Sequence, residues 1–81
     1  MKVEVFGTGC ATCHLLERHV EEAVRETGVT AEVVKVDDIA EIMRRGIIFT
    51  PGLAIDGEIK VSGRVASVKE IRELLTGGAK E

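Results

Sequence analysis

Apolar residues recur at helical spacing in three segments of the chain. Between residues 11 and 27 they lie every three or four positions with charged side chains between them, and Gly28 follows at the predicted helix end. A shorter segment over residues 39–43 and a last one after Ser67 have the same period, and Ser67 with Glu70 forms a capping-box pattern. We therefore predict one long and two shorter amphipathic helices.

Four further segments have the alternation and the β-branched content of strands. They cover residues 2–6, 31–36, 53–55 and 58–61, and the last two flank an Asp-Gly pair that is typical of a two-residue hairpin turn. The long helix between the first two strands favours a right-handed parallel β-α-β unit. The predicted order is β-α-β-α-β-β-α, which makes the chain an α/β protein.

The composition is that of one small domain over residues 1–81. Its apolar residues are almost all aliphatic, with two phenylalanines and no tryptophan or tyrosine, so few side chains could stack on bases or sugars. The net charge of −3, with acids and bases interleaved, argues against nucleic acid and against an anionic membrane surface as partners. The glycine-rich residues 76–81 are expected to form a flexible tail.

The start of the chain and its hydropathy predict a cytoplasmic protein. No apolar run approaches the roughly 20 residues of a membrane span, and the first residues enter a strand pattern without the apolar stretch of a signal peptide. In a reducing compartment a close pair of cysteines is more often catalytic or metal-binding than structural.

The two cysteines of the chain, Cys10 and Cys13, lie where the first strand gives way to the long helix. Their spacing lets the sulfurs meet as a dithiol or disulfide couple. A helix N-terminus offers unpaired N–H groups and the positive end of the helix dipole, so a thiolate at Cys10 is stabilised there. We expect Cys10 to be the catalytic nucleophile and Cys13 the resolving thiol.

Three motifs occur together in residues 2–75. Gly-Thr-Gly-Cys-x-x-Cys follows the first strand, Thr50-Pro51 precedes the hairpin, and Ser-Gly-Arg precedes the last helix. With these motifs the chain resembles the small, glutaredoxin-like members of the thioredoxin superfamily. The resemblance implies a minimal thioredoxin fold with a four-stranded mixed sheet and three helices. It also implies a cis Pro51 that lies against the cysteine pair, with Thr50 and Pro51 binding a substrate strand. The dipeptide Ala11-Thr12 between the cysteines departs from the commoner proline-containing forms.

The same resemblance implies a thiol–disulfide oxidoreductase that reduces disulfides of partner proteins. The Cys10 thiolate would form a mixed disulfide with the partner, and Cys13 would then resolve it. The chain has no nucleotide or flavin site of its own, so we expect no cofactor and a separate enzyme, similar to thioredoxin reductase, that recycles the oxidised pair. A monomer is expected.

The same cysteines suit other chemistry. In heavy-metal-associated domains a Cys-x-x-Cys loop before a helix carries Cu(I), so a soft-metal carrier is the alternative function, although the β-α-β-β-α-β order of those domains differs from the predicted one. Cys10-x-x-Cys13-His14 also matches the attachment signature of c-type haem, which normally requires export. A four-ligand zinc site would need His19, which we expect on the helix surface, away from the cysteines. No metal site is predicted.

The remaining candidates have simpler interpretations. Glu4 lies six residues before Cys10, and ordinary thioredoxins have a buried acid at this offset, near the resolving cysteine. By that resemblance Glu4 could accept the Cys13 proton, but we prefer to interpret it as a solvated or salt-bridged strand residue. A protonated His14 would favour a thiolate nearby. Solvated charges are predicted at Arg44, Arg45 and Arg64, and a core position is predicted at Met43.

Overall fold

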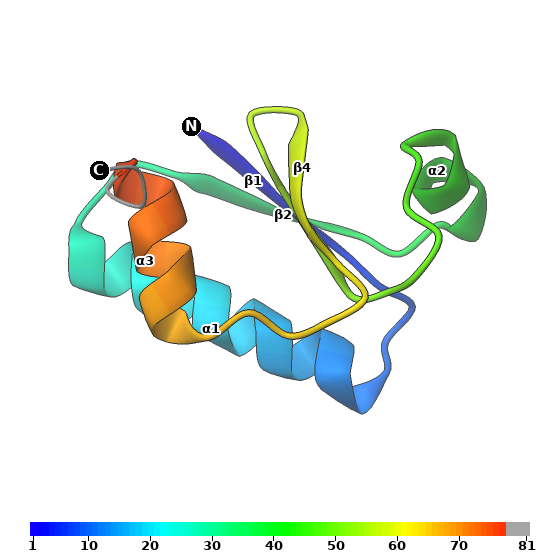
Figure 1. The fold of residues 1–81 in the computed structure, drawn as a ribbon, viewed down its shortest axis with the longest axis horizontal. Coiled ribbons are helices and arrows are strands. Elements are labelled where there is room, and N and C mark those ends of the chain that lie inside the picture. Colours follow the sequence, from blue (N-terminus) through cyan, green and yellow to red (C-terminus); the bar gives the residue numbers. More distant parts are fainter. Residues whose placement is uncertain (78–81) are drawn as a thin grey trace.

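The computed structural model describes residues 1–77 and has the predicted order of elements (Figure 1). The seven elements are β1 (Lys2–Phe6), α1 (Ala11–Thr27), β2 (Glu32–Val36), α2 (Ile39–Arg44), β3 (Gly52–Ile55), β4 (Glu58–Ser62) and α3 (Val68–Thr76). Of the tail expected over residues 76–81, Thr76 ends α3 and Gly77 caps it, and residues 78–81 lie outside the described part. Within residues 1–77, no helix combines the length and the apolar character needed to cross a membrane.

The four strands form one mixed sheet in the order β2-β1-β3-β4. Strand β1 pairs in parallel with β2 and antiparallel with β3, and β3 pairs antiparallel with β4. The parallel β1-α1-β2 unit and the mixed sheet are therefore confirmed. The predicted hairpin is confirmed as well, because Asp56 and Gly57 have φ values of 51° and 87°, the left-handed conformation that a tight two-residue hairpin turn requires.

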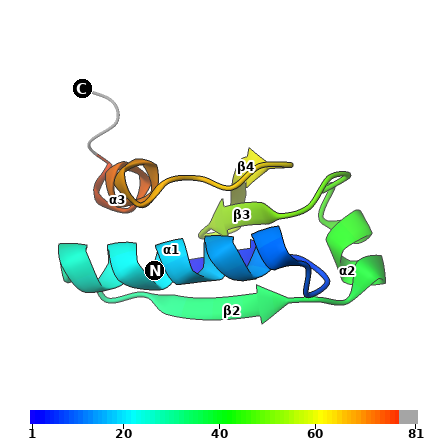
Figure 2. The same ribbon diagram turned by 90° about the horizontal axis from the view of Figure 1, so that it is seen from below.

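Helices cover the sheet unequally. Helices α1 and α3 lie together on one face and α2 lies on the other (Figures 1 and 2). The larger core, between the sheet, α1 and α3, contains Val3, Val5, Leu16, Val20, Ala23, Leu53, Ile55, Val61, Ala66, Ile71 and Leu75. The smaller core, beneath α2, contains Phe6, Ile42, Ile47 and Ala54. The alternation of side chains along β1 divides its residues between the two cores.

Helix α2 buries little of its surface. Its six residues bury only Ile42, and Ile39 and Met43 are 62% and 68% exposed. The prediction that Met43 is a core residue is therefore wrong. A helix of fewer than two turns can direct one side chain into the small core, and the residues next to it at helical spacing remain at the rim.

Two helix ends are capped as their sequences predict. Gly28 closes α1 in the left-handed conformation, with its N–H bonded to the Val24 carbonyl at 3.0 Å. Ser67 caps α3 by accepting the Glu70 N–H at 3.1 Å. The Glu70 carboxylate binds Arg64 through both oxygens, at 2.6 and 2.8 Å, so Arg64 is ion-paired where we predicted a solvated charge.

Candidate functional site

The loop between β1 and α1 places both cysteines at the start of the long helix. Cys10 is the N-cap of α1, with extended backbone angles, and Cys13 lies in the first turn. The two residues form a disulfide, with their Cα atoms 5.1 Å apart. The expectation that this spacing brings the two sulfurs together is confirmed.

The two cysteines differ sharply in exposure. Cys10 is exposed, whereas Cys13 is 1% exposed and packed behind it. A disulfide of another molecule can therefore reach the sulfur of Cys10 from solvent but not that of Cys13. This asymmetry fits the roles that the sequence predicts for the two residues.

Two hydrogen-bonding groups point at the sulfur of Cys10. The backbone N–H of Cys13 donates to it at 3.2 Å, and the Thr12 hydroxyl oxygen lies 3.2 Å from it. The first turn of α1 contains no acidic residue. Both groups, together with the positive end of the helix dipole, would stabilise negative charge on this sulfur once the disulfide is reduced.

Gly7 lies directly against the buried cysteine. A Cβ atom at this position would lie 2.7 Å from the Cβ of Cys13 and would overlap its sulfur. The Gly7 N–H also bonds to the Val36 carbonyl at 3.0 Å, which extends the β1–β2 pairing up to the loop. The absence of a side chain at Gly7 thus allows the backbone to pass close to Cys13.

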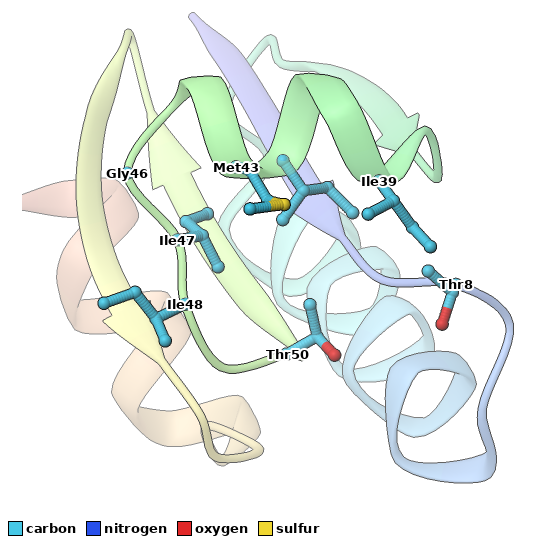
Figure 3. A pocket seen from close by; sticks show the side chains of 8 residues that line it. Thr8, Ile39, Met43, Gly46, Ile47, Ile48 and Thr50 are labelled. Atoms are coloured by element: carbon cyan, nitrogen blue, oxygen red, sulfur yellow. The ribbon is translucent and has the colours of Figure 1, made fainter.

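The segment before β3 carries the two predicted substrate-binding residues. The Thr50–Pro51 peptide bond is cis, as the resemblance implied. Thr50 is exposed, whereas Pro51 is buried and its carbonyl accepts the Gly63 N–H at 2.8 Å. Thr50 and Thr8 line the same pocket, so this segment and the loop that leads to Cys10 lie beside each other (Figure 3).

Glu4 is a buried, salt-bridged strand residue, in agreement with the preferred interpretation. Its two carboxylate oxygens each accept a hydrogen bond of 2.8 Å from Arg45. The Arg45 hydrogen bonds lower the pKa of Glu4, burial opposes this, and the charges of Arg45 and Lys2 lower it further. Arg45 is therefore not the solvated charge that we predicted. Glu4 alternates with Val3 and Val5 of the larger core, so it faces away from the α1 side of the sheet.

The sequence analysis missed the partner of Glu4. Arg45 lies 41 positions away, at the end of α2, where its guanidinium is also 5.2 Å from the centre of the Phe6 ring. The signal available in the sequence was strand alternation, which puts Glu4 and Phe6 on the same face. The position of α2 over that face could not be read from the sequence.

Neither histidine is bonded to a sulfur. The exposed His14 has its Nδ1 3.7 Å from Glu17, and Lys35 lies 3.5 Å from the same carboxylate. The prediction that His19 is a surface residue is wrong, because it is half-buried with its Nδ1 2.8 Å from the Ala66 carbonyl. No group of three or more His, Cys, Asp or Glu residues in the described chain could hold a metal ion.

The arrangement of α2 also separates the chain from the alternative fold. Helix α2 stands between β2 and the β3–β4 hairpin, whereas heavy-metal-associated domains have the order β-α-β-β-α-β. The soft-metal carrier was an alternative because heavy-metal-associated domains have a similar Cys-x-x-Cys loop before a helix. The fold of this chain around that loop differs from theirs.

Comparison with known proteins gives consistent matches over almost the whole chain. A family model described as "Thioredoxin domain" matches residues 1–76. A protein named thioredoxin from Methanothermobacter thermautotrophicus is 47% identical over 76 residues, which is 94% of this chain and 99% of that protein. A protein named thioredoxin from Methanocaldococcus jannaschii is 44% identical over 73 residues, covering 90% of this chain and 84% of its own length.

Proposed function

Because this chain belongs to the thioredoxin family and is a thiol–disulfide oxidoreductase, we propose that it reduces disulfide bonds of partner proteins through Cys10 and Cys13. One observation supports this proposal most directly. An exposed sulfur at a helix N-terminus is bonded to a buried sulfur that solvent does not reach. In such a pair the exposed sulfur can react with a partner's disulfide, and the buried sulfur can then release the partner by forming the internal disulfide.

The reaction begins with the pair reduced. The Cys10 thiolate attacks one sulfur of the partner disulfide, a mixed disulfide forms, and the other partner sulfur leaves as a thiolate that takes up a proton. Cys13 then loses its proton and attacks the Cys10 sulfur. This second step releases the remaining partner thiol and forms the Cys10–Cys13 disulfide. Two electrons pass from the chain to the partner.

Thr50 and Pro51 form the proposed binding platform for the partner segment. Thr50 is exposed and shares a pocket with Thr8, two residues before Cys10, so a segment joined to Cys10 passes beside it. Pro51 is buried and held through its carbonyl by Gly63. A fixed Pro51 keeps the backbone of Thr50 in place to bind a partner strand by hydrogen bonds.

The cycle needs a source of electrons outside this chain. We assign that role to a separate enzyme of the thioredoxin-reductase kind, which returns two electrons and two protons to the disulfide. The proposed setting is the cytoplasm, where partner thiols remain reduced after exchange. The proposed active unit is a monomer with residues 1–81 as one domain.

The test is reduction of insulin disulfides with dithiothreitol as the electron donor. We expect the wild-type chain to accelerate the reaction and Cys10→Ser to abolish the acceleration. Cys13→Ser is expected to keep only part of the acceleration, because dithiothreitol from solution, and not Cys13, must then release the mixed disulfide. A Cys10→Ser variant that is as active as the wild type would refute the proposed mechanism.

A further inference from the structure

A pocket of about 460 Å³ opens next to the redox site (Figure 3). It lies between the loop before Cys10, helix α2 and the segment that joins α2 to β3. Its lining contains no charged residue and consists of Thr8, Ile39, Ile42, Met43, Gly46, Ile47, Ile48 and Thr50. A volume of this size is within the range of sites that hold small ligands, so the pocket has room for a bulky side chain of a partner.

The apolar wall of the pocket is largely uncovered. Ile39, Met43 and Ile48 are 62%, 68% and 83% exposed, and Phe49, next along the chain, is 69% exposed. Single exposed apolar residues need no explanation, but several that share one concave surface indicate a binding site.

The pocket is continuous with the surface at which exchange occurs. Thr8 lies in the loop between β1 and α1, two positions before Cys10. Thr50 lies in the segment between α2 and β3 and lines the same pocket (Figure 3). A partner segment that leads away from Cys10 between these two loops therefore extends over one end of this pocket. The residues that flank the partner's cysteine are the part of it that can reach the apolar wall.

Charge decides which side chains fit. The pocket lining carries no charge, and the two arginines at the end of α2 are already paired, Arg44 with Glu41 and Arg45 with Glu4. A charged partner group in the pocket would lose its hydration without finding an opposite charge, whereas an aliphatic group would cover Ile39 and Met43.

We propose that this pocket selects partners that carry a bulky aliphatic side chain a few residues from the reacting cysteine. The proposal rests on the proposed function and adds a substrate class to it. The aliphatic side chain occupies the pocket while the partner sulfur is bonded to Cys10. Binding outside the reacting atoms then favours these disulfides over others of equal reactivity.

The test uses pairs of peptide disulfides that differ at one position. Leucine or serine is placed two, three or four residues from the cysteine on either side, and kcat/KM for reduction is measured for the wild type, Met43→Glu and Ile59→Glu. Met43 and Ile59 are both partly exposed apolar residues, and Ile59 lies on β4, outside the pocket lining. Comparison of the two variants therefore separates an effect on the pocket from the effect of adding a negative charge to the surface.

For at least one placement we expect the wild type to prefer the leucine peptide by about tenfold, the selectivity that burial of one aliphatic side chain provides. Met43→Glu should bring that ratio to near one, and Ile59→Glu should keep it. Equal rates on all peptides, or equal loss of the ratio in both variants, would overturn the pocket proposal and leave the proposed function standing. If the wild type reduces insulin but none of the peptides, the pocket proposal fails alone, and if it reduces neither insulin nor the peptides, both proposals fail.

Discussion

At the scale of single residues, the two cysteines owe their difference to position in the first turn of α1. Cys10 caps the helix from outside and Cys13 faces the interior. Thr12 is the one side chain between them that can bond to sulfur, and its hydroxyl oxygen is 3.2 Å from Cys10. In the reduced chain this hydroxyl can donate to the Cys10 thiolate, next to the Cys13 N–H.

Replacing Thr12 therefore should change the reactivity of Cys10. In Thr12→Val the shape is retained and the donor is lost, so a smaller fraction of Cys10 is thiolate at a given pH. We expect alkylation of the reduced chain by iodoacetamide at pH 6 to slow by about three- to tenfold, the effect of one hydrogen bond of ordinary strength. Thr12→Ser, which keeps the hydroxyl, should alkylate at the wild-type rate. Equal rates in all three proteins would contradict this role of Thr12.

The disulfide and the cis peptide bond agree with the expectations from the sequence better than the packing of the helices does. The Cys10–Cys13 pair follows from a short motif whose geometry is local, and the cis Thr50–Pro51 bond was implied by the family resemblance. The positions of Met43 and His19 were wrong because each depends on which element packs against its helix. Burial of that kind is decided by residues far away in the chain, and periodicity alone does not identify them.

At the scale of elements, one ion pair ties the end of α2 to the centre of the sheet. Glu4 on β1 is buried, and Arg45, immediately after α2, is 25% exposed at its side chain. Because α2 buries only Ile42, this pair is a large part of what holds the helix, and with it the pocket wall, against the sheet.

Removal of Arg45 should leave a buried carboxylate without its main partner. We expect Arg45→Met to lower the free energy of unfolding at pH 7, measured by urea denaturation, by clearly more than loss of a surface pair does, because the buried Glu4 carboxylate loses its main partner. The matched control is Arg44→Met. Arg44 is exposed and pairs with Glu41 on the surface, so its loss should cost about 0.5 kcal/mol or less.

The loss of unfolding free energy in Arg45→Met should also depend on pH, and its direction follows from the pKa of Glu4. Arg45 lowers the pKa of Glu4 in the folded chain below its ordinary value of 4.5. The stabilisation is therefore complete above pH 4.5 and is lost as the pH falls through the folded pKa of Glu4. The difference between wild type and Arg45→Met should narrow in acid. If the difference in unfolding free energy between the two proteins stays constant from pH 7 down to pH 3, the stabilising role of the Glu4–Arg45 ion pair would be contradicted.

The order of elements was predictable because each helix and each strand has its own period and its own end signals. The end signals have the local roles that their residue types predict: Gly28 ends α1, Ser67 caps α3, and Asp56-Gly57 forms the hairpin turn. The layering of α2 was not predictable in the same way. Its contacts join residues about 40 positions apart, as Glu4 and Arg45 do.

At the scale of the whole molecule, the two faces of the sheet have different tasks. The larger core between the sheet, α1 and α3 supplies most of the buried apolar surface and supports the redox helix. The opposite face has a small core covered only by the short helix α2, and its rim forms the apolar pocket, which Thr8 of the loop before Cys10 also lines. The stable face thus holds the reacting pair, and the less covered face is available to partners.

The central claim, that Cys10 attacks and Cys13 resolves, is tested most directly by a trapping measurement. Reduced Cys13→Ser is mixed with a peptide disulfide of the leucine series, and the products are identified by intact mass spectrometry before and after dithiothreitol. The account predicts a covalent one-to-one adduct through Cys10 that dithiothreitol releases, and predicts none with Cys10→Ser, whose remaining cysteine is buried. An adduct through Cys13 in the Cys10→Ser protein, or no adduct in Cys13→Ser, would contradict it.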